Sequence, residues 1–204
     1  MKSSGLSREA REDARLVREC RAGSERAFEA LIGRHQDQVF NVACRMVGDR
    51  EEALDLAQET FIKAFQGLGD FKEEMPFRAW LMRICTNSAI DLLRRRGRRR
   101  EFAVDMRPSS GGPAAPGALA PALEPRAPAR EIPENVSLSN ETAEAVYGGL
   151  ETLPDKYRAV LVLHHMEQMS YSEIGKVLGV PRNTAKTWGY RARGLLCQAL
   201  EGVM

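Results

Sequence analysis

A proline-rich stretch near the middle of the chain sets the strongest limit on its fold. Residues 103–135 hold seven of the ten prolines in the 204-residue sequence and are also rich in alanine and glycine. Proline removes backbone donors, and alanine and glycine have little side chain to bury. The stretch therefore predicts a flexible linker between two small domains. We expect one domain over residues 1–101, the linker over 102–138 and a second domain over 139–204.

Both flanking segments show helical periodicity. Apolar residues recur at helical spacing over residues 14–47, and no stretch alternates with period two for long enough to predict a sheet. Gly23 and Ser24 predict the end of one helix and the N-cap of the next. Pro76 is well placed in the first turn of a further helix that runs to about Arg95. The predicted fold class is all-α, with two small helical domains.

Several classes of protein are excluded by composition. The longest apolar run has five residues, at 159–163, which is too short to cross a bilayer. The N-terminus is charged and has no apolar signal core, so we expect a cytoplasmic protein without direct membrane insertion. The four cysteines lie far apart and form no C-x-x-C pair, which argues against a disulfide framework or a zinc site. We expect reduced thiols that pack as small apolar residues.

The sequence offers no arrangement of residues typical of an enzyme. Its three histidines are His35, His164 and His165, and the adjacent pair points in different directions on a helix. No nucleophile motif, phosphate-binding glycine loop or metal-ligand spacing is present. We therefore predict no catalytic residue, no metal and no cofactor, and we interpret the histidines as surface or packing residues.

The segment from Leu54 to Phe65 carries polar residues on one side of a predicted helix. Leu54, Phe61 and two alanines are expected to face the core, together with Phe65. The opposite side, which we call the acidic face, consists of Asp55, Gln58, Glu59 and Ile62. One interpretation is a solvated surface with a single stray apolar residue. The other is a docking surface for a basic partner.

The helix predicted after Pro76 has a similar division. Its core side is expected to hold Phe77, Leu81, Ile84, Cys85, Ser88 and Leu92, and its outer stripe Arg83, Asn87 and Arg94, with Trp80 and Thr86 at the margins. Arginine, asparagine and an aromatic ring on one surface suit single-stranded nucleic acid. The alternative is a partly buried Trp80 on a helix whose polar residues only solubilise it. Six arginines within residues 94–100, in a chain of net charge +2, favour binding to a polyanion.

The C-terminal segment predicts a helix-turn-helix. Ser170 and Glu173 have the spacing of a capping box, Gly179 can end the first helix, and Pro181 can begin the second. Residues 181–200 contain four basic residues and no acidic one. The expected outward side of the second helix holds Asn183, Lys186, Thr187 and Tyr190, flanked by Arg182, Arg191 and Arg193. Such a helix suits a DNA major groove, and a short structural helical hairpin is the alternative.

Three blocks of sequence together resemble one protein family. They read AFEALIGRHQDQVFNVACRMVGDREEALDLAQETFIKAF, PFRAWLMRICTNSAIDLLRRRGRR and LPDKYRAVLVLHHMEQMSYSEIGKVLGVPRNTAKTWGYRAR. In this order the blocks resemble regions 2 and 4 of the extracytoplasmic-function (ECF) sigma factors, group IV of the sigma-70 family. The resemblance implies an alternative sigma factor that binds core RNA polymerase and directs initiation at promoters with −35 and −10 elements.

The resemblance also implies a role for each surface. The acidic face corresponds to the surface that docks on the β′ clamp helices, and region 4 to the part that meets the β flap. Residues implied at the −10 element are Trp80, Arg83, Thr86, Asn87, Arg94 and Arg95. Residues implied at the −35 element are Arg182, Asn183, Thr184, Lys186, Thr187, Tyr190 and Arg191. Control by an anti-sigma factor is implied as well.

The chain departs from the family pattern at Trp188 and Gly189, where arginine and then leucine are common. Glycine inside a helix costs about 1 kcal/mol relative to alanine, so we expect the recognition helix to bend or fray there. The linker is also longer and richer in proline and alanine than expected. The chief rival interpretation is a helix-turn-helix repressor or activator, which leaves the acidic face and the tryptophan-bearing stripe without a purpose.

Overall fold

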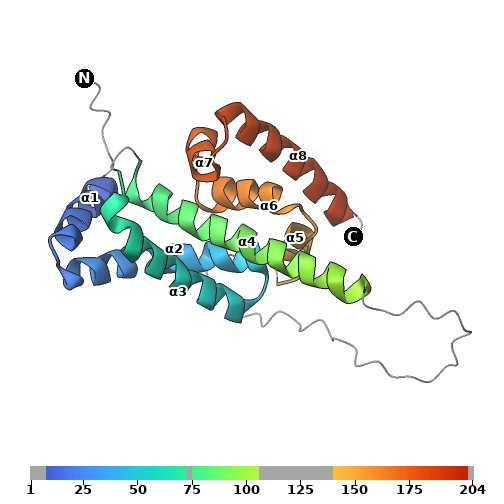
Figure 1. The fold of residues 1–204 in the computed structure, drawn as a ribbon. Helices are drawn as coiled ribbons and strands as arrows, with labels where there is room; N and C mark the ends of the chain where they lie inside the picture. The colour runs from blue at the N-terminus through green and yellow to red at the C-terminus, as the bar shows by residue number, and fades with distance from the viewer. Residues whose placement is uncertain (1–7, 73–74, 106–139, 202–204) are drawn as a thin grey trace, which may run out of the picture.

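The computed structural model describes residues 8–72, 75–105 and 140–201, with side chains except at 98–105 and 140–144. In these ranges the regular elements are helical, as predicted. The N-terminal domain contains α1 (Arg8–Arg21), α2 (Glu25–Val47), α3 (Arg50–Gly67), η1 (Leu68–Asp70) and α4 (Phe77–Asp105) (Figure 1). The C-terminal domain contains α5 (Asn140–Glu151), α6 (Asp155–Leu161), η2 (Val162–Met166), α7 (Tyr171–Leu178) and α8 (Arg182–Glu201).

The turns of the N-terminal domain follow local sequence signals. Gly23 has φ 94° between α1 and α2, a left-handed conformation that glycine adopts without steric strain. The hydroxyl of Ser24 then accepts a hydrogen bond of 3.3 Å from the backbone N–H of Ala27 and caps α2. Asp49 caps α3 in the same way, at 2.9 Å from the N–H of Glu52. The predicted helix boundary at Gly23 and Ser24 is confirmed.

Helix α4 is longer than the sequence predicts. It begins as expected, with the Pro76 carbonyl accepting from the N–H of Trp80 at 3.1 Å, but it continues past Arg95 to Asp105. Arginine is a good helix former, so the basic run extends the helix instead of ending it. The first residues of the predicted linker 102–138 thus belong to α4. The rest of that linker lies outside the described residues.

One hydrophobic core joins the two domains. Fully buried side chains of the N-terminal domain include Leu31 and Met46 of α2 and Leu81 of α4. The same cluster continues into Leu163 and Ile174 of the C-terminal domain. Helices α6 and α7 contact α4, and η2 contacts α2, whereas α8 packs on the outer side of α6 and α7 (Figure 1).

Helix α3 buries a different stripe from the predicted one. Its buried residues are Ala53, Leu56, Ala57, Thr60 and Ala64. Leu54 and Phe65, which were expected to face the core, are 44% and 58% exposed. Most side chains of the buried stripe are small, which lets α3 lie close to α2 and α4. Because this stripe faces the core, Leu54 and Phe65 point outward.

The helix-turn-helix forms as the sequence predicts. The Ser170 hydroxyl accepts from the N–H of Glu173, and the Glu173 carboxylate accepts from the N–H of Ser170 at 2.9 Å, which completes the capping box. Gly179 has φ 67° and ends α7 in the left-handed conformation. Helix α8 starts at Arg182, directly after Pro181.

Candidate nucleic-acid and partner-binding surfaces

The acidic face lies on the outside of α3. Asp55, Gln58, Glu59 and Ile62 are all exposed, and Ile62 retains 57% of its accessible surface. The Glu59 carboxylate is 2.6 Å from the ammonium of Lys63, one turn further along the helix. An exposed pair of this kind contributes little to stability, so Glu59 can exchange Lys63 for another cation.

An apolar strip that sequence reasoning missed borders the acidic face. Leu54 and Phe65 lie on the same side of α3, and the ring of Phe65 meets Phe28 of α2 edge-on, with 4.9 Å between centroids. Helical spacing puts Leu54 and Phe65 on one side of α3 beside Ile62, but the apolar character of Leu54 and Phe65 predicts a core position and not an exposed strip. The surface therefore combines carboxylates with a larger hydrophobic area than one isoleucine provides.

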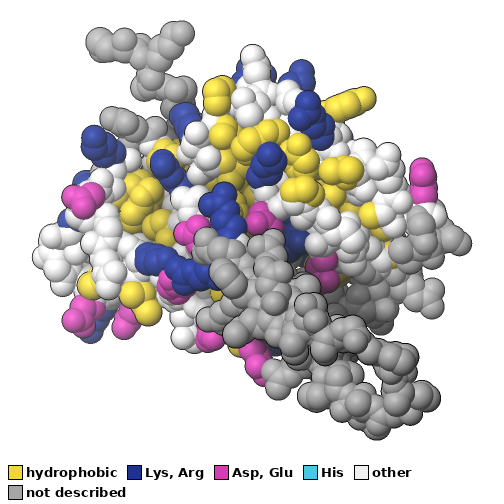
Figure 2. Space-filling view, turned by 45° about the vertical axis from the view of Figure 1, so that its right-hand side comes forward, with side chains coloured by type: hydrophobic (Ala, Val, Ile, Leu, Met, Phe, Trp, Pro, Cys, Tyr) yellow, Lys and Arg dark blue, Asp and Glu magenta, His cyan; other side chains and the backbone are white. Residues whose placement is uncertain are grey.

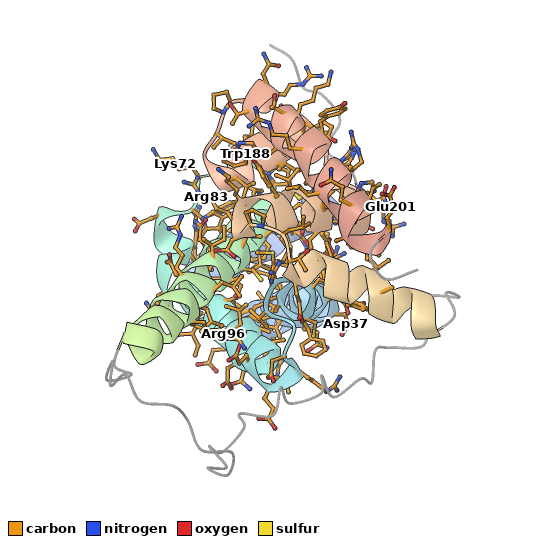
Figure 3. All side chains as sticks on the ribbon, turned by 90° about the vertical axis from the view of Figure 1, so that its right-hand side faces the viewer. Asp37, Lys72, Arg83, Arg96, Trp188 and Glu201 are labelled. Atoms are coloured by element: carbon orange, nitrogen blue, oxygen red, sulfur yellow. The ribbon has the colours of Figure 1, made fainter. Side chains whose placement is uncertain are left out.

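The predicted outer stripe of α4 is largely present. Arg83, Asn87 and Arg94 are exposed, and Arg83 lies on the part of α4 nearest the C-terminal helices (Figure 3). The stripe also contains an acidic residue, Asp91, whose carboxylate is 3.9 Å from the Arg94 guanidinium. Two arginines and one amide remain the main donors on this surface.

Trp80 belongs to an aromatic cluster at the start of α4. Its ring is half-buried, with centroids 4.9 Å from Phe71 and 5.7 Å from Phe77. Gly67 of α3 closes the other side, because a Cβ there would come within 3.4 Å of the indole. The interpretation of Trp80 as partly buried is therefore correct, and only part of the indole borders the Arg83 stripe.

Thr86 does not lie on the exposed stripe. Its side chain is fully buried, and its hydroxyl donates to the Met82 carbonyl one turn earlier, at 2.7 Å. A threonine can satisfy its hydroxyl within its own helix, so a polar residue can occupy the core side. In this structure Thr86 has no surface to offer to DNA, contrary to the expectation from the resemblance.

The arginine run at the end of α4 has two different roles. Arg94 and Arg95 are exposed. Arg96 instead donates to the Val47 carbonyl at 3.1 Å and lies 3.1 Å from the Glu52 carboxylate. These contacts join α4 to the end of α2 and the start of α3. The side chains of residues 98–100 lie outside the described residues.

Most of the α8 residues predicted to contact DNA are exposed. Arg182, Asn183, Lys186, Thr187, Tyr190 and Arg191 are exposed, and Thr184 is half-buried. Tyr190 is 74% exposed, more than any other large hydrophobic residue described. The hydroxyl of Thr187 donates to the Asn183 carbonyl at 2.9 Å, which leaves its oxygen able to accept. The side therefore offers charged, amide and aromatic groups from successive turns.

The fraying of α8 that the sequence predicts at Gly189 does not occur. The helix continues through it to Glu201, and Gly189 is buried against the ring of Tyr171. That ring also stacks on His164 at 4.4 Å, and its hydroxyl accepts from Arg193 at 2.9 Å. The missing side chain is therefore used for packing between α7 and α8, which offsets the low helix propensity of glycine.

Trp188 faces the other side of α8. Its ring lies 6.5 Å from that of Tyr157 on α6, and the Lys156 ammonium is 5.3 Å from its centroid. The indole therefore packs between helices of the C-terminal domain and is not one of the exposed polar groups of α8.

The histidines and cysteines serve mainly in packing. His35 is buried and its Nε2 is 3.0 Å from the Asp13 carboxylate. Burial alone opposes ionisation of Asp13, but its hydrogen bonds and charge interactions with His35 and Arg34 hold its pKa below the ordinary value. Burial raises the pKa of the Cys85 thiol to about 12, whereas Cys197 is exposed.

Two further features bear on the class of protein. Among the described residues, no group of three or more histidine, cysteine or acidic side chains is arranged to hold a metal ion. None of the described helices is long and apolar enough to cross a membrane. On the face drawn in Figure 2, Lys and Arg side chains border an area of hydrophobic side chains.

Comparison with known families matches both domains. The family described as Sigma-70 region 2 matches residues 31–99. The family described as Sigma-70, region 4, matches residues 143–196. The first match covers the acidic face and the α4 stripe, and the second covers the helix-turn-helix.

Individual proteins and solved structures agree with these matches. The RNA polymerase sigma-H factor of Pseudomonas aeruginosa is 33% identical over 193 residues, which cover 95% of this chain and 96% of that protein. The ECF RNA polymerase sigma factor SigW of Bacillus subtilis is 30% identical over 91% of this chain and 95% of its own length. CnrH, solved in complex with the cytosolic domain of CnrY, has a TM-score of 0.63 at 28% identity, covering 94% of this chain and 98% of CnrH. The chain therefore belongs to the sigma-70 family, as an ECF RNA polymerase sigma factor.

Proposed function

We propose that the acidic face of α3 is the main docking site for core RNA polymerase, on the clamp helices of its β′ subunit. Two exposed carboxylates, Asp55 and Glu59, beside the apolar strip of Leu54, Ile62 and Phe65 support this proposal. Carboxylates attract a basic partner surface, and the apolar side chains stabilise the complex once water is excluded. The C-terminal domain would meet the β flap, as the family resemblance implies.

The exposed stripe of α4 would capture the non-template strand at the −10 element. Arg83 and Asn87 are one turn apart and exposed, which suits contact with a phosphate and with the edge of an unstacked base. Arg94 and Arg95 would neutralise phosphates of the adjoining duplex without reading sequence. Trp80 would contribute only its accessible edge, and the buried Thr86 would make no direct contact with DNA.

Helix α8 would read the −35 element in the major groove. Its exposed side carries Asn183, Lys186 and Tyr190 on successive turns, and residues 181–200 contain no acidic residue. Arg182, Thr184, Thr187 and Arg191 would add contacts at the edges of the same side.

The protein would act in the cytoplasm under the control of an anti-sigma factor. The similarity to CnrH, solved with the cytosolic domain of CnrY, supports a partner of this kind. The chain itself would not be an enzyme, because RNA synthesis belongs to the polymerase. It would need neither metal nor cofactor.

The main support for this proposal is that one chain exposes three separate candidate surfaces, on α3, α4 and α8. The test mixes the purified protein with core polymerase in the absence of DNA and then supplies genomic DNA and nucleotides. A sigma factor co-elutes with core and gives transcripts that share −35 and −10 elements. A helix-turn-helix repressor or activator would bind DNA alone and leave core unbound.

A further inference from the structure

Arg21, the last residue of α1, holds the backbone that follows α3. Its Nε donates to the Leu68 carbonyl at 3.0 Å, and its Nη2 donates to the Phe71 carbonyl. Leu68 begins η1, and Phe71 follows it directly. Carbonyls at the end of a helix lack partners within it, and a cation near them is favourable. The last turn of α3 contains no basic residue, so α1 supplies this cation.

Phe71 links this contact to the aromatic cluster at the start of α4. The Arg21 guanidinium lies 5.9 Å from the centroid of the Phe71 ring. Phe71 is only 4% exposed, and its centroid lies 4.9 Å from that of Trp80 and 5.9 Å from that of Phe77. Because buried rings are closely packed, a shift of η1 would move the ring against which Trp80 rests.

Helix α1 also supports the cluster through α2. The Asp13 carboxylate lies 3.0 Å from Nε2 of His35, and both side chains are buried. The His35 ring in turn packs against Phe77, with 5.6 Å between centroids. Two rings of the cluster, Phe71 and Phe77, therefore have a support that begins on α1.

The cluster adjoins the proposed −10 surface. Trp80, Arg83 and Asn87 are separated by three and four residues, which places them on one side of α4. Figure 3 shows Lys72, the residue after Phe71, on the same side of the view as Arg83. The backbone that Arg21 holds thus leads to the part of the molecule where the α4 stripe begins.

We propose that Arg21 is a positioning residue for promoter opening, which acts through Phe71 to hold the edge of Trp80 beside the α4 stripe. Arg21 itself does not contact DNA in this role. The inference rests on the proposed function, because it concerns capture of the −10 strand by that stripe. It assigns a role to α1, which lies outside the match to Sigma-70 region 2 at residues 31–99.

A positioning role affects promoter opening and initial binding differently. Core binding uses the acidic face, and the closed complex depends on duplex contacts of α8, so neither step requires the edge of Trp80. Opening requires an unstacked base to meet the surface around Trp80 and Asn87. A merely structural role would lower stability without changing how well the folded protein opens promoters.

The experiment replaces Arg21 in the full-length protein. Arg21→Gln removes the charge and the guanidinium fork, whereas Arg21→Lys keeps the charge but loses the fork that reaches two carbonyls. Arg15→Gln is the matched control, because Arg15 lies on the same helix and makes exposed ion pairs with Glu12 and Glu19. Circular dichroism and urea unfolding establish a temperature at which each variant is folded.

Four measurements at that temperature separate the steps. Hydrogen exchange of peptides that cover η1 and the first turns of α4 reports local loosening. Native gels report core affinity, and filter binding reports the closed complex. Permanganate footprinting reports the bubble, on a promoter identified by transcription of genomic DNA.

Arg21→Gln should speed exchange in η1 and early α4 and reduce the bubble signal about tenfold, while core affinity and the closed complex stay at wild-type values. Arg21→Lys should lie between Arg21→Gln and the wild type, and Arg15→Gln should match the wild type. Phe71→Leu should reduce the bubble signal as well. Adding Arg21→Gln to Phe71→Leu should then cause little further loss, because both substitutions affect one route.

A folded Arg21→Gln variant with a wild-type bubble would overturn the proposal, whether or not its stability falls. Full additivity of the Arg21 and Phe71 substitutions would also overturn it, and the single variants decide the matter even where Phe71→Leu is too unstable to use. If the wild type binds no core or opens no promoter, the proposed function fails and this role fails with it. Normal opening by both the wild type and Arg21→Gln refutes the role of Arg21 alone.

Discussion

The ring of Tyr171 occupies the space that a side chain at Gly189 would need. A Cβ on Gly189 would come within 2.8 Å of a ring carbon and 2.9 Å of the hydroxyl oxygen of Tyr171. Two partners hold the ring in place, since it stacks on His164 and its hydroxyl accepts from Arg193. The contact sets how closely α7 and α8 pack, and hence the orientation of the exposed side of α8.

We therefore expect Gly189→Ala to destabilise the protein by about 1–3 kcal/mol, because the overlap with Tyr171 outweighs the gain in helix propensity. Gly194→Ala is the matched control in the same helix, since a Cβ there meets nothing within 4 Å. The control should stabilise the protein by up to about 1 kcal/mol. Urea unfolding measures both changes, and two variants of equal or greater stability than the wild type would contradict the packing argument.

Reversing the charge of the acidic face should abolish holoenzyme formation. In the variant Asp55→Arg with Glu59→Arg, like charges meet the basic partner surface, at a cost of several kcal/mol in binding. Loss of the exposed Glu59–Lys63 pair should change stability by less than about 1 kcal/mol. The matched control reverses Glu29 and Asp37, which are exposed on α2. Native gels with core polymerase report binding, and a folded acidic-face variant that still binds core would rule out this docking site.

Asn87→Ala should impair promoter opening more than initial promoter binding. An unstacked base needs hydrogen bonds to its edge, and a premelted −10 template should not restore full activity if Asn87 supplies them. Permanganate footprinting measures the bubble, and filter binding at low temperature measures the closed complex. Gln36→Ala, at an exposed position of α2, is the control. Equal bubble signals in the variant and the wild type would refute the role of Asn87.

Lys186 and Tyr190 should affect −35 binding in different ways. Lys186→Ala removes a phosphate contact, so affinity should fall uniformly across sequences and the salt slope should decrease by about 1. Tyr190→Ala removes a group that meets a base edge, so the preferred −35 sequence should change. Selection from a randomised −35 library tests both variants. The same selected motif for wild type and Tyr190→Ala would count against the role of Tyr190.

Alanine substitutions at Arg94 and Arg96 should affect different properties, promoter affinity for Arg94 and stability for Arg96. Arg96→Ala loses the contacts to the Val47 carbonyl and to Glu52, so the free energy of unfolding should fall by about 1 kcal/mol. Arg94→Ala should leave stability nearly unchanged and weaken promoter affinity at low salt. Thermal unfolding and salt-dependent binding distinguish the two, and the reverse pattern would mean that the assignments are exchanged.

Short sequence signals predict several helix ends of this fold. The capping box at Ser170, the left-handed Gly179 and the N-cap at Ser24 each depend on a few neighbouring residues, and all three are present. The predicted end of α4 near Arg95 is too early, because arginine is a good helix former and the helix continues through the basic run to Asp105.

Sequence patterns could not settle which side of a helix is buried. Leu54 and Phe65 are apolar and exposed, whereas Thr86 is polar and buried, because small alanines fill the core side of α3 and a helix carbonyl satisfies the threonine. Nor could a sequence pattern predict the ion pair between Arg78 of α4 and Glu167 of the C-terminal domain, because that contact depends on how the two domains pack together. The roles of the site residues remain predictions that the proposed experiments decide.

The packing of Trp80 and Trp188 gives the chain a natural pair of spectroscopic probes. They are its two tryptophans, one in the aromatic cluster of α4 and the other between α6 and α8. The ammonium of Lys156 lies 5.3 Å from the centroid of the Trp188 ring, whereas the Trp80 ring packs against Phe71 and Phe77, so the two rings have different electrostatic surroundings. Replacing either ring with phenylalanine would leave emission from one half of the molecule, and the melting of each half could be followed without an attached dye.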